Sequence, residues 1–179
     1  KPIGKVGQNR DSQGLSEYDI AASATAIYFQ DPVGMAATGT ITVAAAGGVL
    51  LGSLGGVFFT DASTSKPTYA NHLDASNTAT DIVGFVSDDP YERFEVQSDN
   101  SGASAQTDIG NVADIVYAAG SSPDYVSKVE LDDSDLATSD GQLKVIGLSK
   151  DPDNSDLTSA NVNWVVTINE HFLKQEAGV

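Results

Sequence analysis

The sequence predicts an all-β protein, a small β-barrel or sandwich with an extended N-terminal arm. Eight short segments are apolar or alternate apolar and polar residues with a period of two, which is the pattern of strands. Clusters of Gly, Pro, Asp and Asn separate these segments, and such residues favour turns. The acidic residues are 19 Asp and 6 Glu, and Asp is a poor helix former. Many short strands between turn residues are typical of barrels and sandwiches.

In chain order, the predicted strands are residues 40–44, 55–60, 81–86, 93–97, 114–117, 127–131, 142–148 and 162–169. The first alternates as Thr-Ile-Thr-Val-Ala, and the second is an apolar run that starts at a glycine pair. The third stops before Pro90, because proline has no N–H to donate to a ladder. The fourth places Phe94 and Val96 on one face. The sixth alternates again, and the remaining segments complete the set.

The chain divides into an arm and a body. Residues 1–16 are polar and glycine-rich, and they hold three of the nine cations, Lys1, Lys5 and Arg10. A segment that cannot bury its own apolar surface is either disordered or ordered by a neighbour, so we expect an extended arm. Residues 17–179 are expected to form one β-rich body with a weak division near 99–106. Residues 16–29 hold four alanines among Ser and Thr, so helix and strand both remain open there.

The charge of the chain limits its partners. The formal net charge is −16 with a pI of about 4.1. This excludes nucleic acid and anionic membranes as favoured partners, since both bind cationic surfaces. Between residues 67 and 127, Arg93 is the only cation against ten acids. This region is either a solvated acidic face or an acidic patch that docks on a basic partner. The start shows no apolar leader, and glycines interrupt the apolar stretch 41–59, so we expect neither signal peptide nor membrane span.

The residues name no reaction. With no cysteine, the chain has no disulfide, thiolate metal site or Cys nucleophile. The two histidines, His72 and His171, are far apart and favour solvated or structural roles. The acidic runs 132–135 and 151–156 do not match a calcium loop, so turn roles are favoured over calcium binding. We therefore expect a non-enzymatic protein without cofactor, catalytic residue or metal.

Seven sequence stretches resemble small virion structural proteins of tailed bacteriophages, especially capsid cement (decoration) proteins of phages that infect marine bacteria. The stretches are IYFQDPV (27–33), TGTITVA (38–44), LGGVFF (54–59), DDPYERFEVQ (88–97), TDIGNVAD (107–114), VIGLSKDPDN (145–154) and VTINEH (166–171). The resemblance depends on the seven stretches taken together, not on any one of them. The resemblance extends from about residue 5 to residue 174.

The resemblance implies a role in assembly. Such a protein binds the major capsid protein at junctions between capsomers, and it also contacts neighbouring copies of itself as a trimer or dimer. It is expected on the outer surface of the capsid in the virion, and in the host cytoplasm during assembly. The arm would reach a neighbour, with Lys5 and Arg10 available for carboxylates. Leu15, Tyr18 and Ile20 would anchor the base of the arm at this interface.

Two other readings remain open. One is another β-rich virion component, such as a tail, fibre or vertex protein, which copy number would distinguish from a cement protein. The other is a carbohydrate-binding or hydrolytic β-domain on the virion surface, for which the candidate aromatic residues are Tyr69, Tyr91, Tyr125 and Trp164. Trp164 lies in an alternating strand, which favours a place in the core.

Overall fold

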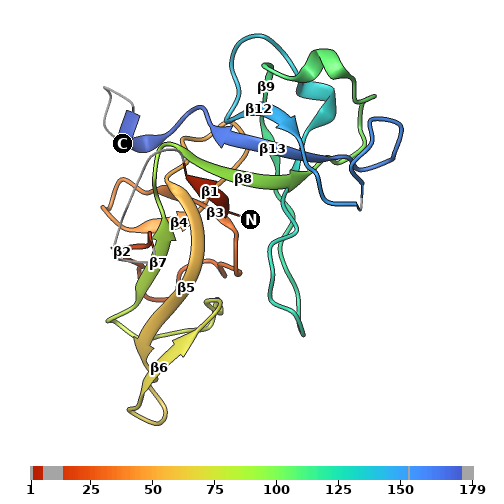
Figure 1. Ribbon diagram of the computed structural model, residues 1–179. Coiled ribbons are helices and arrows are strands. Elements are labelled where there is room, and N and C mark those ends of the chain that lie inside the picture. The colour runs from red at the N-terminus through yellow and green to blue at the C-terminus, as the bar shows by residue number, and fades with distance from the viewer. Residues whose placement is uncertain (1, 6–13, 153, 175–179) are drawn as a thin grey trace.

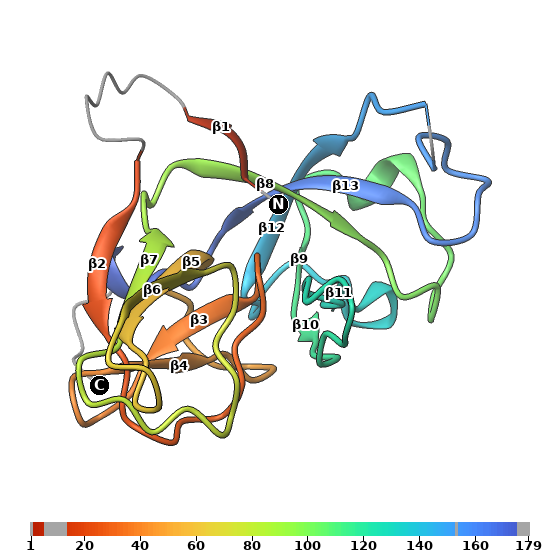
Figure 2. The same ribbon diagram turned by 90° about the horizontal axis from the view of Figure 1, so that it is seen from below.

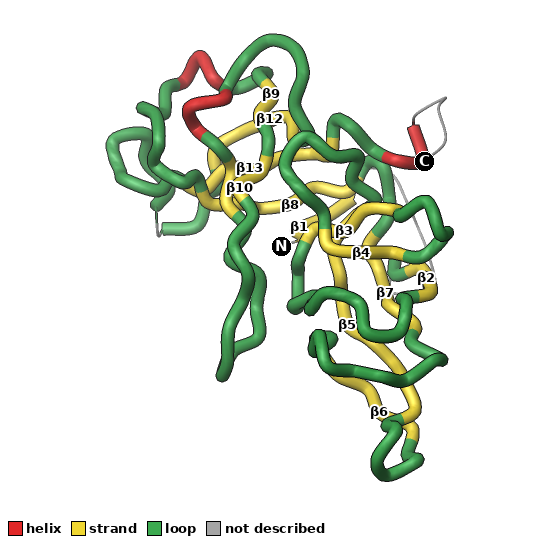
Figure 3. The backbone as a smooth tube through the Cα atoms, turned by 180° about the vertical axis from the view of Figure 1, so that it is seen from behind, coloured by secondary structure: helices red, strands yellow, loops and turns green. Residues whose placement is uncertain are grey.

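The computed structural model describes residues 2–5, 14–152 and 154–174, with the backbone alone for residues 2–5. The protein is all-β, as predicted, and the helical segments in the described ranges are three short 3₁₀ turns (Figures 1 and 3). The strands are β1 (Pro2–Lys5), β2 (Ser16–Asp19), β3 (Pro32–Met35), β4 (Ile41–Val43), β5 (Gly52–Thr60), β6 (Pro67–Ala70), β7 (Val83–Ser87), β8 (Glu92–Gln97), β9 (Val112–Ala113), β10 (Ile115–Val116), β11 (Glu130–Leu131), β12 (Leu143–Leu148) and β13 (Asn163–Ile168). The 3₁₀ turns are η1 (Gln106–Asp108), η2 (Asp133–Asp135) and η3 (Phe172–Lys174).

The first half of the chain builds a six-stranded antiparallel sheet. Its order is β2-β7-β5-β3-β4, and β6 pairs with the second half of the long strand β5. A single parallel bridge between Ile20 and Ile41 brings the two edges of this sheet together at one point. Among the described residues no sheet closes into a barrel, so the sandwich-like alternative holds. We call this sheet and the core beneath it the N-terminal lobe.

The second half of the chain builds the C-terminal lobe. Its five-stranded antiparallel sheet has the order β1-β8-β13-β12-β9, and β10 and β11 form a separate two-stranded ribbon. Strand β1 comes from the start of the chain and pairs antiparallel with β8, with Lys5 opposite Glu92. Figure 2 shows β8 running from the N-terminal lobe, beside β7, into the C-terminal lobe.

Each lobe has its own hydrophobic core. The N-terminal core gathers buried residues between Ile20 and Val86, and the C-terminal core is formed mainly by residues from Phe94 to Ile168. The change from one core to the other falls between β7 and β8. The weak division expected near residues 99–106 is instead a loop within the C-terminal lobe, because the strands before and after it share one core.

Backbone contacts hold the two lobes together. The adjacent residues Leu50 and Leu51 are both buried, and they point into different cores, Leu50 into the C-terminal one and Leu51 into the N-terminal one. Leu50 donates its N–H to the carbonyl of Glu170 (2.9 Å) and accepts from the N–H of Phe172 (2.8 Å). Residues 117–129 form a hairpin, teal in Figure 1, that reaches back to Phe29 through two backbone hydrogen bonds.

A buried glutamine makes a further link between the lobes. Gln142 is fully buried at the start of β12. Its amide nitrogen donates to the carbonyls of Ala45 (2.9 Å) and Gly48, and its amide oxygen accepts from the N–H of Ile115 (3.1 Å). One side chain therefore hydrogen-bonds both to a tight turn in the first half of the chain and to a strand in the second half.

Each of the eight predicted segments contains a strand, but the lengths differ. Residues 127–131 are mostly the return arm of the hairpin, and only β11 at their end pairs as a strand. Strands β1, β2, β3, β6 and β9 were not predicted. β3 and β6 each begin with proline. β6 pairs with β5, and β3 pairs with both β4 and β5. Residues 16–29, where helix and strand were both open, contain β2 and irregular backbone.

Candidate docking surface

Three aromatic side chains gather on the outer face of the N-terminal sheet. Phe58 on β5 lies directly opposite Tyr69 on β6, and their ring centroids are 4.8 Å apart. Phe85 on β7 belongs to the same face, and its ring stacks against that of Tyr69 with the centroids 6.3 Å apart. We call Phe58, Tyr69 and Phe85 the aromatic face.

The alternation of the strands explains why these rings point outward. Val57, Gly84 and Val86 face the N-terminal core, so their neighbours Phe58 and Phe85 face the other way. A Cβ atom added at Gly84 would lie 2.8 Å from the Cδ1 atom of Ile41, which shows how closely the inner face is packed. The inner face of the sheet is therefore fully packed against the core, and the aromatic face lies on the outer side of the sheet.

The aromatic face combines exposed apolar area with an acidic border. Tyr69 is 74% exposed, more than the other large hydrophobic residues of the described chain, and Phe58 and Phe85 are half-buried. Glu17 pairs with Phe85 across β2 and β7, and both Glu17 and Asp19 on β2 are exposed. Aromatic groups bordered by charge are typical of interaction surfaces, where the rings supply buried area and the charges supply orientation.

The predicted interface residues at the base of the arm are part of the N-terminal lobe. Ile20 is only 4% exposed and belongs to the N-terminal core, so its side chain packs inside this chain, and its predicted contact with a partner stays a prediction. Tyr18 is half-buried and packs against the same core. Leu15 is half-buried against Gly55, since a Cβ atom there would lie 3.2 Å from the Leu15 methyl groups.

Of the two cationic residues predicted to make contacts from the arm, the structure describes Lys5 but not Arg10. Lys5 is the last residue of β1, whose backbone pairs with β8 of the same chain. The start of the expected arm is therefore an edge strand of the C-terminal sheet of the same chain. Arg10 lies outside the described residues, so its predicted contact stays a prediction.

Tyr18 and His171 lie near the buried Asp88-Asp89 link between the lobes. The Tyr18 hydroxyl donates to Asp88 Oδ2 at 2.8 Å. Burial, together with this hydrogen bond and the negative charge of Asp88, raises the pKa of Tyr18 to about 12. His171 is fully buried, and burial lowers its pKa despite the nearby carboxylates. Its Nδ1 accepts from the N–H of Leu173 (3.0 Å), which fixes a neutral ring in a structural role.

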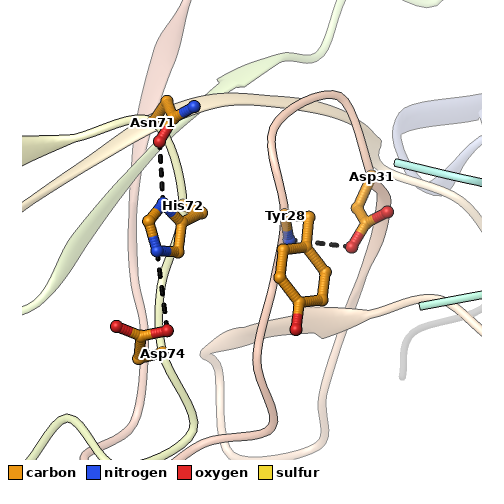
Figure 4. A network of polar contacts seen from close by, with 5 residues as sticks. All are labelled: Tyr28, Asp31, Asn71, His72 and Asp74. Carbon is orange, nitrogen blue, oxygen red and sulfur yellow. Dashed lines mark hydrogen bonds and ion pairs between the residues drawn. The ribbon is translucent and has the colours of Figure 1, made fainter. Parts of the chain in front are cut away.

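His72 lies in a stack of rings that joins the hairpin to the N-terminal lobe. Its ring lies 3.9 Å from that of Tyr125, centroid to centroid and nearly parallel, and the Tyr28 ring lies beside both. Figure 4 shows His72 between Asn71 Oδ1, at 2.7 Å from Nδ1, and Asp74 Oδ1, at 3.5 Å from Nε2. These three rings pack the hairpin against the N-terminal lobe.

The acidic runs cap turns, as predicted. Asp132 Oδ1 accepts from the N–H and the hydroxyl of Ser134, and Asp156 Oδ1 accepts from the N–H and the hydroxyl of Thr158. Within the residues described, no three His, Asp or Glu side chains come together as a metal site.

The aromatic candidates for carbohydrate binding do not form one platform. Trp164 is fully buried in the C-terminal core, as its alternating strand predicted, so it cannot contact a glycan. Tyr125 is covered by His72. Tyr91 lies in the link between β7 and β8, where Lys174 Nζ sits 4.7 Å from the centre of its ring. Tyr69 alone belongs to the aromatic face. Sequence reasoning missed Phe58 and Phe85 because their convergence depends on the pairing of β5, β6 and β7.

Comparison with protein-family models, with curated proteins and with solved structures finds no match to this chain. Over the part of the chain that is described, no helix has the length and apolar character needed to cross a membrane.

Proposed function

We propose that this chain is a non-enzymatic virion structural protein that decorates the capsid of a tailed bacteriophage. It binds the major capsid protein at capsomer junctions, together with neighbouring copies of itself, on the outer surface of the shell. The sequence resemblance over most of the chain suggests this role. The observation that carries it in the structure is the aromatic face with its acidic border.

The aromatic face suits a protein that coats another protein. Aromatic side chains account for much of the binding energy in protein interfaces, because they bury large areas with little loss of side-chain freedom. The exposed carboxylates of Glu17 and Asp19 beside the face favour a partner surface that carries Lys or Arg. Many symmetric copies allow each contact to be weak while the coat as a whole is stable.

Cosedimentation with expanded shells that lack this protein tests the proposal. The wild-type chain is expected to pellet with the shells and to saturate at a fixed number of copies per shell. Tyr69→Ser removes the most exposed ring of the aromatic face and is expected to weaken binding at least tenfold. Tyr91→Ser is the matched control, because Tyr91 is also exposed (62%) but lies outside this face.

Two results separate the parts of the proposal. If the wild-type chain does not bind shells, the decoration role is wrong. If it binds shells and Tyr69→Ser binds equally well, the role stands and the aromatic face is not the surface used. A Glu17→Lys, Asp19→Lys variant is expected to lower affinity for a basic shell surface, and added salt is expected to weaken the wild-type complex.

A further inference from the structure

A cavity of about 200 Å³ lies where the two lobes meet. The first half of the chain contributes Gln30, Pro32, Leu50, Gly52 and Ser53 to its wall. The C-terminal lobe contributes residues of β8, β10, β12 and β13. The hairpin closes one side with Ser127 and Val129. The cavity therefore exists only when both lobes and the hairpin are in place.

The lining of this interlobe cavity suits an uncharged group. Most of its lining residues are apolar, among them Leu50, Phe94, Ile115 and Val166. Glu95 is the one charged residue among the described residues that line it, and its carboxylate accepts from the Ser149 hydroxyl (2.9 Å), which is not part of the lining. The amide and hydroxyl residues of the wall, such as Gln30, Gln97 and Ser127, can meet one or two polar atoms of a ligand.

The wall at Gln30 is held in an uncommon conformation. Gln30 has a φ of 68°, in the left-handed region that non-glycine residues seldom occupy. Its N–H donates to the Leu54 carbonyl (2.8 Å), and the fully buried Asp31 accepts from the N–H of Tyr28 (2.8 Å), as Figure 4 shows. Such backbone strain persists only where the surroundings hold it, and it gathers at ligand sites.

We propose that the interlobe cavity is a binding site for a small uncharged aromatic ligand in the size range from benzene to indole. Pockets for drug-sized ligands measure roughly 300–1,000 Å³, so this one is too small for them. An apolar cavity of about 150 Å³ is enough to hold benzene. The cavity is partly open to solvent, which gives a ligand a route into it. The proposal is independent of capsid binding.

The test is a titration of the whole chain with indole. Binding is monitored by NMR of methyl-labelled Ile, Leu and Val residues. Saturable shifts are expected at Ile115, Leu143, Val166 and Ile168, which line the cavity. Methyl groups of the N-terminal core, such as those of Leu73, are expected to stay unchanged. The midpoint of thermal unfolding is expected to rise with indole concentration, because the ligand binds the folded state. Indole-3-acetate, which carries a carboxylate, is expected to bind at least tenfold more weakly than indole.

A filling variant and a matched control locate the site. Val129→Phe places a larger side chain on the cavity wall and is expected to weaken indole binding at least tenfold. Val126→Phe makes the same change in the same hairpin at an exposed residue that does not line the cavity, and it is expected to bind indole like the wild type. The proposal is overturned if indole gives no saturable shifts up to its solubility limit, or if the shifts lie elsewhere. If Val129→Phe does not fold, the location of the wild-type shifts decides alone.

Discussion

Replacing the buried Gln142 with Met tests how the two lobes are joined. Methionine keeps the size and apolar stem of the side chain but removes the amide. The carbonyls of Ala45 and Gly48 and the N–H of Ile115 then lose their partner. At a net contribution of about 1 kcal/mol for each hydrogen bond, the free energy of unfolding falls by about 3 kcal/mol. For a chain of this size, that lowers the melting temperature by roughly 6–12 °C.

The assay is urea denaturation followed by fluorescence of the single Trp164 and by circular dichroism. Gln106→Met is the control, because Gln106 is exposed in η1 and the same change there is expected to cost nothing measurable. If Gln142→Met loses less than about 0.5 kcal/mol, comparable with a surface substitution, the buried amide does not hold the lobes together. An unchanged slope of the urea transition would show that both variants unfold from the same native state.

Two further predictions concern packing and pH. Gly84→Ala places a Cβ atom 2.8 Å from Ile41 Cδ1 and 3.0 Å from Ile20 Cδ1, so overpacking is expected to cost about 1–3 kcal/mol in urea denaturation. Gly147→Ala on β12 meets no atom within 4 Å and is expected to be neutral or stabilising; equal losses in the two variants would refute the packing argument. Burial raises the pKa of both Tyr18 and Tyr117 from 10.0 to about 12, and nearby carboxylates add to the shift. Since the folded state holds these protons more tightly, their stabilisation is present below pH 10 and is lost as the pH rises toward 12. Absorbance titration is expected to show late ionisation of Tyr18 and Tyr117, and Tyr18→Phe is expected to remove one late-ionising group.

The local pattern of the sequence was enough to predict the strands that carry their own signal. Alternation in residues 93–97 and 162–169 predicted β8 and β13, and it also predicted the burial of Trp164. Local pattern could not predict β6, because a short segment that begins with proline becomes a strand only through pairing with β5. The presence of two cores was missed for a related reason. Leu50 and Leu51 read as one apolar run, yet they serve different cores.

The candidate surface was the least predictable part of the molecule. Tyr69 was singled out as an aromatic residue, but its neighbours Phe58 and Phe85 come from strands whose register no local signal reveals. Ile20 was expected at an interface because it is apolar and close to the arm, and the bridge to Ile41 places it in the core. The acidic border of β2 was expected only as part of the overall charge of the chain.

The most direct test of the proposed function is cryo-electron microscopy of the intact particle, reconstructed with the icosahedral symmetry of its shell. The account predicts density for this chain at regular sites over capsomer junctions, with the aromatic face of the N-terminal lobe against the major capsid protein. A bare shell, with density for this chain confined to the tail or to one vertex, would contradict it.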